Sequence, residues 1–454
     1  MQLEQSDISA ICGGILHAGN SARVTSVNTD TRKLLQGSLF VALNGEQFDG
    51  HSYLQHAQQQ GAVAALVESF NAGVSLPQIQ VQNSQLALGT LAREWLARMP
   101  CKRIALTGSN GKTTVKNLTH AILSGVAPTC ATEGNFNNEI GLPLSALRVR
   151  SSDEFAVLEM GAGAPGDIAY LAGIVMPQIA LVNNASAAHV ERLGTIDAIA
   201  HEKTAIYRAL PADGVAVIPM DDAFSARYIE AAKHVKVISF GLQDSADIRA
   251  EAIQAGEGTH FELIGPFGRA AVNLPLLGLH NVRNALAAAA LSYAAGADLL
   301  AIVHGLQGAN AAKGRLQRVQ QQGGWFLIDD SYNANPGSVM AAIDTLSALP
   351  GQHILVLGDM AELGGESALL HRQVFDYAAA RGTTKLLCLG SKSAEAAHAS
   401  GFGQAFDTLE DLLSALRACL AAANIETTHV LVKGSRSSKM ERVVQALDAA
   451  VLAC

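Results

Sequence analysis

The eight residues Thr107 to Thr114 read Thr-Gly-Ser-Asn-Gly-Lys-Thr-Thr, which is the composition of a loop that holds nucleotide phosphates. An apolar segment, 104–106, precedes them, and apolar residues recur at helical spacing after them. Glycines let backbone N–H groups approach phosphate oxygens, the helix start favours negative charge, and a lysine can reach the terminal phosphates. Thr113 is expected to ligate magnesium. The residues predicted to bind ATP here are Gly108, Ser109, Asn110, Gly111, Lys112, Thr113 and Thr114.

The glycine spacing of this loop departs from the common phosphate-loop pattern. That pattern would place a glycine five residues before Gly111, where the chain has Leu106. The alternative is an ordinary glycine turn between a strand and a helix. The order of strand, glycine turn and helix favours the nucleotide loop.

Composition and charge narrow the class of protein. A chain of 454 residues with 49% hydrophobic content is long enough for about three domains, each with its own core. The net charge of −8 lacks the basic excess of a nucleic-acid binder, so no nucleic-acid partner is expected. The six cysteines have no Cys-x-x-Cys pair, which argues against zinc and disulfide frameworks and favours a reducing cytoplasm. Neither a signal peptide nor a membrane span is predicted, and without a heptad repeat we expect a monomer.

Apolar strand candidates alternate with helical stretches along most of the chain, which predicts an α/β fold in three domains. Residues 1–100 are expected to form a small N-terminal α/β domain. Residues 101–313 are expected to form a central ATP-binding domain on a parallel sheet, opened by the nucleotide loop. Residues 314–454 are expected to form a C-terminal Rossmann-like α/β domain.

Three titratable residues that follow the loop in the central domain are considered as site residues. Glu159 ends the apolar run 155–158 and should stand at the carboxyl edge of a parallel strand, where ligands bind and a carboxylate suits magnesium. The alternative for Glu159 is a solvated loop carboxylate. His189 follows the next strand, 179–182, through a polar turn, and is as compatible with a structural role as with a functional one. Lys203 lies in a helical stretch, where a surface lysine is the default.

The C-terminal region has polar clusters at three strand ends, namely 329–336, 358–364 and 433–436. Clusters of this kind occur in simple turns, but at the ends of parallel strands they also form binding edges. Lys433 and Arg436 add cationic donors suited to a carboxylate or a phosphate. Two α/β domains that face each other across such edges would form a cleft for two substrates.

Together these segments resemble the Mur ligase family over nearly the whole chain. Among its members the similarity is greatest to the one that adds D-alanyl-D-alanine to UDP-N-acetylmuramoyl-tripeptide in peptidoglycan synthesis. The segments that carry the resemblance are 107–114, 135–143, 158–162, 278–284, 329–336, 357–364 and 432–436, and the last three separate this member from its sister ligases.

The resemblance implies ATP and two magnesium ions as cofactors. Lys112 would bind the ATP phosphates, Thr113 and Glu159 would serve one magnesium, and His189 would help to hold the second. Lys203 would carry a carbamate that ligates this second ion, although Ala205 stands where the family pattern has glutamate.

The resemblance also assigns substrate contacts. Further nucleotide contacts would come from Asn281, Asn284, Arg315 and Asp330. The incoming dipeptide would meet Asn333, Asn335 and Ser338. The uridine-diphosphate sugar would bind Thr29, Asp30, Thr31, Arg32, Phe48, Asp49, Gly50 and His51.

Two alternatives stay open at this point. One is a related ligase that adds a different amino acid, including the folate polyglutamating ligases, which share the nucleotide loop. The other is a nucleotide-dependent switch or binding module, because the loop alone would serve either purpose. The clusters at 329–336 and 357–364 argue against the first, and the set of Glu159, His189 and Lys203 argues against the second.

Overall fold

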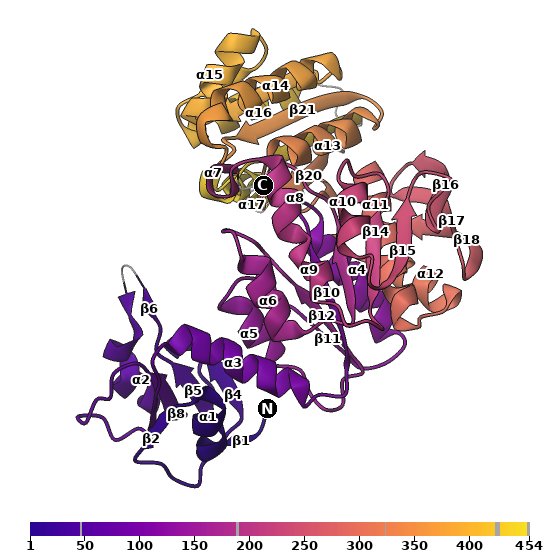
Figure 1. Ribbon diagram of the computed structural model, residues 1–454. Coiled ribbons are helices and arrows are strands. Elements are labelled where there is room, and N and C mark those ends of the chain that lie inside the picture. Colours follow the sequence, from indigo (N-terminus) through magenta and orange to yellow (C-terminus); the bar gives the residue numbers. More distant parts are fainter. Residues whose placement is uncertain (46–47, 188–189, 323, 423–426, 452–454) are drawn as a thin grey trace.

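The structure is a computed structural model that describes residues 1–45, 48–187, 190–322, 324–422 and 427–451. Three lobes follow one another along the chain, from the indigo N-terminal lobe to the yellow C-terminal one (Figure 1). The three largest sheets of the described residues each fall in a different lobe. Within the described residues, no helix is both long enough and apolar enough to cross a membrane.

The N-terminal lobe is built on a five-stranded sheet of order β2-β9-β8-β5-β4. Buried runs such as β5 and β8 pair in parallel and form its centre. Its elements are β1 (Leu3–Glu4), α1 (Gln5–Cys12), β2 (Ile15–His17), β3 (Arg23–Val24), β4 (Ser26–Asn28), β5 (Ser38–Val41), β6 (Asn44–Gly45), β7 (Phe48–Asp49), α2 (Leu54–Gln59), β8 (Ala62–Val67), β9 (Gln78–Gln80) and α3 (Ser84–Ala97).

The central lobe holds a nine-stranded sheet of order β11-β12-β10-β13-β14-β15-β16-β17-β18. Its elements are β10 (Lys102–Thr107), α4 (Lys112–Ser124), β11 (Thr129–Ala131), α5 (Gly141–Ala146), β12 (Phe155–Glu159), α6 (Asp167–Val175), β13 (Ile179–Val182), α7 (Val190–Leu193), α8 (Ile196–Lys203), α9 (Ala205–Arg208), β14 (Val215–Pro219), α10 (Ser225–Ala231), β15 (Lys236–Gly241), β16 (Ile248–Ala255), β17 (Thr259–Gly265), β18 (Gly268–Leu274), α11 (Leu279–Ala295) and α12 (Leu299–Gln307).

The expected parallel sheet is present, but it is longer than the sequence predicts. Strands β11 to β16 pair in parallel, whereas β17 and β18 continue the sheet as an antiparallel meander. These last strands alternate buried and exposed residues and are joined by short turns, which is the pattern of a sheet with one solvated face. This meander was not predicted.

The C-terminal lobe has a six-stranded sheet of order β19-β20-β24-β21-β22-β23, parallel except for the pair β19 and β20. Its elements are β19 (Gln317–Gln320), β20 (Phe326–Asp330), α13 (Pro336–Ser347), β21 (Gln352–Gly358), α14 (Ser367–Ala380), β22 (Lys385–Leu389), α15 (Ser391–Ser400), β23 (Gln404–Phe406), α16 (Leu409–Ala422), β24 (Thr428–Lys433) and α17 (Glu441–Val451). The apolar runs of this region form the strands β20, β21, β22 and β24.

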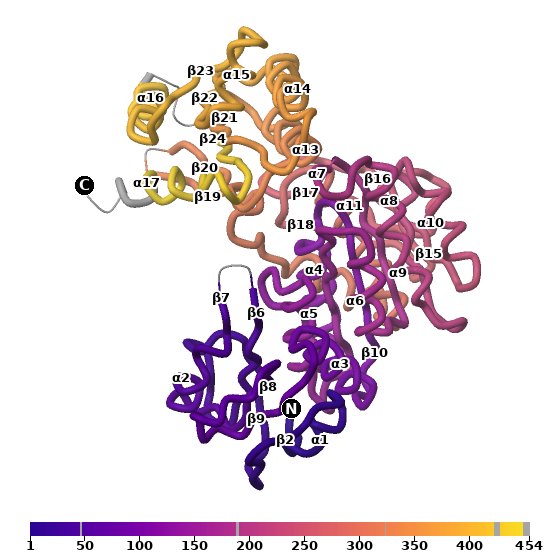
Figure 2. Tube along the Cα trace, turned by 60° about the vertical axis from the view of Figure 1, so that its left-hand side comes forward, coloured from indigo at the N-terminus to yellow at the C-terminus, as the bar shows by residue number. Residues whose placement is uncertain are grey.

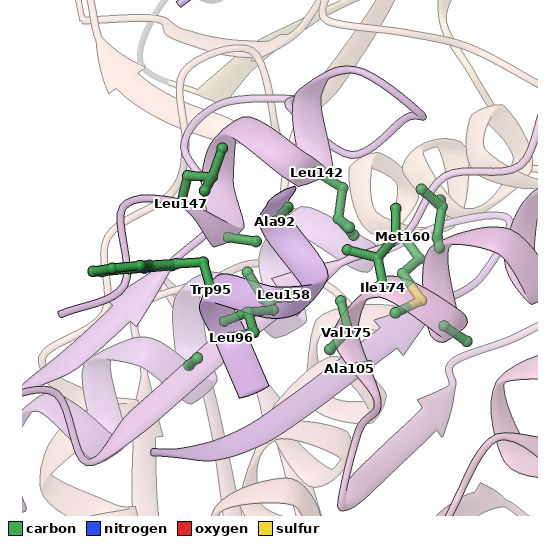
Figure 3. Close-up of a cluster of buried hydrophobic side chains, with 14 of the residues drawn as sticks. Ala92, Trp95, Leu96, Ala105, Leu142, Leu147, Leu158, Met160, Ile174 and Val175 are labelled. Atoms are coloured by element: carbon green, nitrogen blue, oxygen red, sulfur yellow. The ribbon is translucent and has the colours of Figure 1, made fainter. Parts of the chain in front are cut away.

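Helix α3 joins the N-terminal lobe to the central one. Its buried face, which includes Ala92, Trp95 and Leu96, packs in one hydrophobic cluster with Leu142 of α5 and Ile174 of α6 (Figure 3). The Trp95 indole N–H also donates to the backbone carbonyl of Val149 at 2.9 Å. These contacts attach the N-terminal lobe to the central sheet on the side away from the C-terminal lobe (Figure 2).

Candidate active site

The nucleotide loop connects β10 to α4, as its glycines predict. Gly111 precedes α4 with φ +79°, and a Cβ there would lie 2.3 Å from Asn284 Oδ1. Both the left-handed backbone and the close approach therefore require glycine. Lys112 Nζ donates to the carbonyl of Gly108 at 2.6 Å, so the ammonium lies within the curve of the loop. Burial lowers the pKa of Lys112, and the nearby Glu159 carboxylate opposes this.

Polar residues after β13 hold the loop in place. Asn184 accepts from Asn110 N at 2.8 Å through its Oδ1, and its backbone carbonyl accepts from Ser109 N at 3.0 Å. Asn183 Nδ2 donates to both Asn110 O and Asn284 Oδ1, each at 3.0 Å. Sequence reasoning treated these asparagines only as a polar turn leading to His189. Their position at a neighbouring strand end was the signal that they contact the loop.

Asn281 and Asn284 lie on α11 and line the same cleft. Asn284 Nδ2 donates to Asn281 Oδ1 at 3.0 Å, and Asn281 Nδ2 donates to Leu277 O at 2.8 Å. With Asn183 they form a chain of amides that ends at the glycine turn of the loop. Both residues line the cleft, and part of their hydrogen-bonding capacity supports the loop itself.

Glu159 stands at the carboxyl end of β12 and is 1% exposed, so it is not a solvated loop carboxylate. Its Oε1 accepts from Asn137 Nδ2 at 2.7 Å and lies 3.4 Å from Thr113 Oγ1. Its Oε2 is buried and has no hydrogen-bond partner among the described residues. A buried carboxylate oxygen without a partner, next to a threonine hydroxyl, fits a magnesium ion that also takes oxygens from phosphates and water.

Within the described residues there is no cluster of three or more acidic, histidine or cysteine side chains that would hold a metal without substrate. His189 lies outside the described residues, so its predicted place is not described. Lys203 ends α8 and is 3% exposed, which excludes the default of a surface lysine. Burial and the Lys112 charge lower the pKa of Lys203 to about 7.

The C-terminal lobe presents a polar edge to the same space. Lys433 Nζ donates to Asp330 Oδ2 at 2.6 Å and to Asn333 O at 2.9 Å. Arg315 Nη2 donates to Thr113 Oγ1 at 3.3 Å, and the Arg315 guanidinium lies 4.4 Å from the centre of the Tyr332 ring. Desolvation raises the pKa of Asp330, while Lys433 acts in the opposite direction.

A cleft of about 1120 Å³ lies between these two edges. The predicted residues that line it are Ser109, Asn110, Gly111, Lys112, Thr113, Thr114, Glu159, Asn281, Asn284, Arg315, Asp330, Asn333, Asn335 and Ser338. Gly108 and Lys203 are not part of this lining. Gly108 nevertheless accepts a hydrogen bond from Lys112, and the charge of Lys112 helps to lower the pKa of Lys203.

Three family models match successive parts of the chain. They are described as Mur ligase family, catalytic domain (residues 23–95), Mur ligase middle domain (106–292) and Mur ligase, glutamate ligase domain (314–436). The chain belongs to the Mur ligase family.

Two relatives of this Mur ligase match it over nearly the full length and have the same name. The UDP-N-acetylmuramoyl-tripeptide–D-alanyl-D-alanine ligase of Escherichia coli K12 is 43% identical over 445 residues, which cover 98% of each chain. The Bacillus subtilis ligase of the same name is 34% identical, with 93% of each chain covered.

Solved structures agree with these relatives. MurF from Acinetobacter baumannii superposes with a TM-score of 0.94 at 35% identity, covering 98% of this chain and 99% of that one. MurF from Thermotoga maritima in complex with ADP has a TM-score of 0.81 at 26% identity, covering 94% and 98%. Folylpolyglutamate synthase from Mycobacterium tuberculosis, at 19% identity and a TM-score of 0.65, shares the fold.

The segments predicted to bind the UDP sugar lie in the N-terminal lobe of the Mur ligase, and they do not line the cleft. Asp30 accepts from the backbone and guanidinium of Arg32, which holds the pKa of Asp30 at about 2. His51 Nδ1 lies 2.6 Å from Asp49 Oδ1, and His51 Nε2 accepts from Glu68 N at 2.8 Å. These contacts order both segments.

The exposed members of the two segments are the candidates for substrate contact. The Arg32 side chain is 84% exposed while it pairs with Asp30. Phe48 is 49% exposed and stacks on Tyr53, with the ring centres 5.0 Å apart. The assignment of both segments to the UDP sugar stays a prediction.

Sequence reasoning missed several residues at the site of the Mur ligase. Lys116, one turn after Lys112 on α4, is 4% exposed and donates to Thr132 O at 2.7 Å, while Thr132 Oγ1 accepts from Glu159 N at 3.0 Å. His280 lines the cleft, and burial lowers its pKa to about 4. Lys116 was detectable from its i+4 spacing to Lys112, and His280 lies within the quoted segment 278–284.

Proposed function

We propose that this chain is an ATP-dependent ligase that joins D-alanyl-D-alanine to UDP-N-acetylmuramoyl-tripeptide through an acyl phosphate. The observation that carries the proposal is the cleft in which the nucleotide loop of the central lobe faces the polar edge of the C-terminal lobe. Full-length similarity to ligases of that name supports the choice of substrates. Phosphoryl transfer needs positioning and charge neutralisation rather than a side-chain nucleophile.

The nucleotide is proposed to lie with its phosphates on the loop from Gly108 to Thr114. Backbone N–H groups at the start of α4 face the phosphates, and the Lys112 ammonium supplies positive charge at their end. Arg315 and Asp330 stand on the opposite wall of the cleft and suit the rest of the nucleotide. The solved Thermotoga maritima MurF complex with ADP supports a nucleotide site in this fold.

Thr113 and Glu159 are the residues proposed to hold one magnesium ion. The unpartnered Glu159 Oε2 and the Thr113 hydroxyl are hard oxygen donors on one side of the loop. When bound, magnesium neutralises charge on the phosphates. A second ion is proposed at a carbamate of Lys203, with His189 assisting, because the lowered pKa leaves a large fraction of the amine neutral and able to add carbon dioxide.

The reaction then proceeds in two displacements. The terminal carboxylate of the tripeptide attacks the γ-phosphorus, the bond to the bridging oxygen breaks, and ADP leaves with the electron pair. The dipeptide amine attacks the acyl carbon, and the tetrahedral intermediate expels phosphate as the amine loses a proton. Asn333 and Ser338 are proposed to contact the dipeptide, and the exposed Arg436 guanidinium at the cleft suits its carboxylate.

An ATP-consumption assay tests this function. Phosphate release should require both the UDP-N-acetylmuramoyl-tripeptide and D-alanyl-D-alanine, and mass spectrometry should find the pentapeptide product. A sister ligase would accept a single amino acid in place of the dipeptide, and a nucleotide switch would ignore both substrates. Release that continues unchanged without the dipeptide would refute the proposal.

The third residue of the tripeptide can be tested in the same assay. A solved Acinetobacter baumannii ligase, 35% identical with a TM-score of 0.90, has 2,6-diaminopimelate in its name. We therefore propose diaminopimelate rather than lysine at this position. Comparison of kcat/KM for the two tripeptides decides between them.

We further propose that the ligase acts as a monomer in the cytoplasm. Cys12, Cys101, Cys130, Cys388 and Cys419 are free thiols, and burial raises the pKa of Cys12 to about 12, as suits a reducing compartment. Sedimentation velocity at micromolar concentration should give a single species near the 47.3 kDa of one chain.

A further inference from the structure

Two asparagine side chains join the nucleotide loop to the C-terminal lobe. Asn335 Nδ2 donates to Asn110 Oδ1 at 2.7 Å, and Asn110 Nδ2 lies 3.4 Å from Asn335 Oδ1. The two residues are 225 positions apart in sequence. Asn335 is 9% exposed and Asn110 is half-buried, and both residues line the cleft.

Asn335 also begins helix α13. Its Oδ1 accepts from Ser338 N at 2.9 Å, while its own N–H donates to Ser338 Oγ at 3.0 Å, which forms a reciprocal capping box. The cap fixes the carboxamide relative to the helix. Its Nδ2 is then directed at the loop, so any displacement of α13 displaces the partner of Asn110.

Asn110 is held on its other sides by the central lobe. Its Nδ2 donates to Ser186 Oγ at 3.0 Å, and its backbone is bonded to Asn183 and Asn184. The residue adjoins Gly111, the N-cap of α4, in the loop that forms the proposed phosphate site. The Asn110 side chain is therefore one point at which the C-terminal lobe contacts the loop that holds the nucleotide, beside the bond from Arg315 to Thr113.

We propose that Asn335 is a positioning residue for the nucleotide loop, acting through Asn110, and not a contact for the incoming dipeptide. The inference rests on the proposed ligase function, which supplies the substrates used in the test. What it claims is that the position of α13 affects the affinity of the loop for the nucleotide. The Asn335 Oδ1 accepts from Ser338 N, and one Nδ2 hydrogen is donated to Asn110 Oδ1, so the side chain is held by the cap and by the amide pair. The hydrogen bond from Asn335 to Asn110 thus links the placement of α13 to the order of the loop.

The test separates the cap from the amide pair. Asn335→Ser keeps a neutral side chain that can cap α13 but cannot reach Asn110, and Asn110→Ala removes the other partner. We expect Asn335→Ser to weaken ADP binding, measured by calorimetry, about three- to tenfold, the range for one net hydrogen bond. Its KM for D-alanyl-D-alanine should stay close to that of the wild type.

A double-mutant cycle and a matched control complete the design. In the Asn110→Ala background, Asn335→Ser should cause no further loss of ADP affinity, because the bond is already absent. Asn83 caps α3 through the same kind of bond, to Leu86 N at 2.8 Å, so Asn83→Ser makes the same chemical change at a distant helix. Because serine also caps helices, Asn83→Ser should leave the ADP affinity unchanged and should have little effect on the melting temperature.

Three outcomes would overturn the proposal. Additive losses in the cycle would show that the two side chains act independently. A rise confined to the KM for D-alanyl-D-alanine would return Asn335 to dipeptide binding. A fall in the melting temperature of Asn335→Ser with unchanged ADP affinity would show that Asn335 serves only as the cap of α13. Because ADP binding and melting need no turnover, these results stand even if the ligase reaction itself is not observed.

Discussion

Lys433 Nζ and Asp330 Oδ2 form an ion pair of 2.6 Å at the carboxyl ends of two adjacent strands, β24 and β20, where the two residues are paired in register. The Lys433 side chain is 3% exposed and that of Asp330 is 13% exposed. The same ammonium holds the backbone of Asn333. The pair therefore organises the C-terminal wall of the cleft.

Lys433→Met is expected to destabilise the protein by about 3–5 kcal/mol at neutral pH, because it leaves a buried carboxylate without its cation. Burial already raises the pKa of Asp330, and loss of Lys433 raises it further. A carboxyl with a raised pKa favours the folded state when protonated, so the destabilisation should be larger at pH 8 than at pH 5. Urea denaturation of wild type and variant at both pH values measures this, and the double variant Asp330→Asn with Lys433→Met should recover part of the loss.

The lowered pKa of Lys203 is expected to affect both the pH dependence of the protein's stability and the reactivity of the amine. The pKa is about 7 in the folded protein against 10.5 for an ordinary lysine, so the unfolded chain binds more protons between these values. Without carbon dioxide, stability should therefore rise with pH through this window. Lys203→Met should abolish the rise.

With ¹³C-labelled bicarbonate, the wild type should give a carbamate carbon signal by NMR that Lys203→Met lacks. The variant should also lose at least about 10²-fold in kcat, since a charge-stabilising group is removed. The exposed Lys236 provides the control, because Lys236→Met should leave the signal and the rate unchanged. A carbamate signal that persists in Lys203→Met would contradict the assignment.

Glu159→Gln is expected to raise the magnesium concentration needed for half-maximal activity by at least about tenfold. The amide can still accept from Asn137, so the local packing is kept while the negative charge is lost. Glu133 is exposed and pairs with Arg148, so Glu133→Gln removes an equal charge outside the site. Magnesium titration of phosphate release compares the two variants, and equal magnesium requirements would refute the proposed metal site.

Gly111→Ala is expected to weaken ADP binding by at least about 1.4 kcal/mol, a factor of ten. The new Cβ would meet Asn284 Oδ1 at 2.3 Å and occupy a left-handed backbone. Gly296, with φ +108° and no atom within 4 Å of a built Cβ, separates the two effects. Gly296→Ala should cost about 1–2 kcal/mol of stability through its backbone alone, with no change in ADP affinity by calorimetry.

The sequence by itself determined the local parts of this protein. Apolar runs bounded by turns located β10, β12, β13 and the parallel strands of the C-terminal lobe, because burial on both faces leaves a continuous apolar run. The meander β16 to β18 was missed because its strands mix buried and exposed residues, which gives a weaker signal than a continuous apolar run. The nucleotide loop was readable because glycines, a lysine and hydroxyls act within eight residues.

Only the tertiary structure decided which distant groups meet. Glu159 was correctly placed at a strand end, but its buried environment depends on Asn137, Thr132 and Lys116 from other segments. The low exposure of Lys203 arises from packing around α8, and no local pattern reports desolvation by residues far away in sequence. The pair of Asn110 and Asn335 depends on how two lobes dock. Strand and turn preferences depend on residues that are neighbours in the sequence. Burial and pairing between lobes depend on residues that are distant in the sequence and meet only when the whole chain has folded.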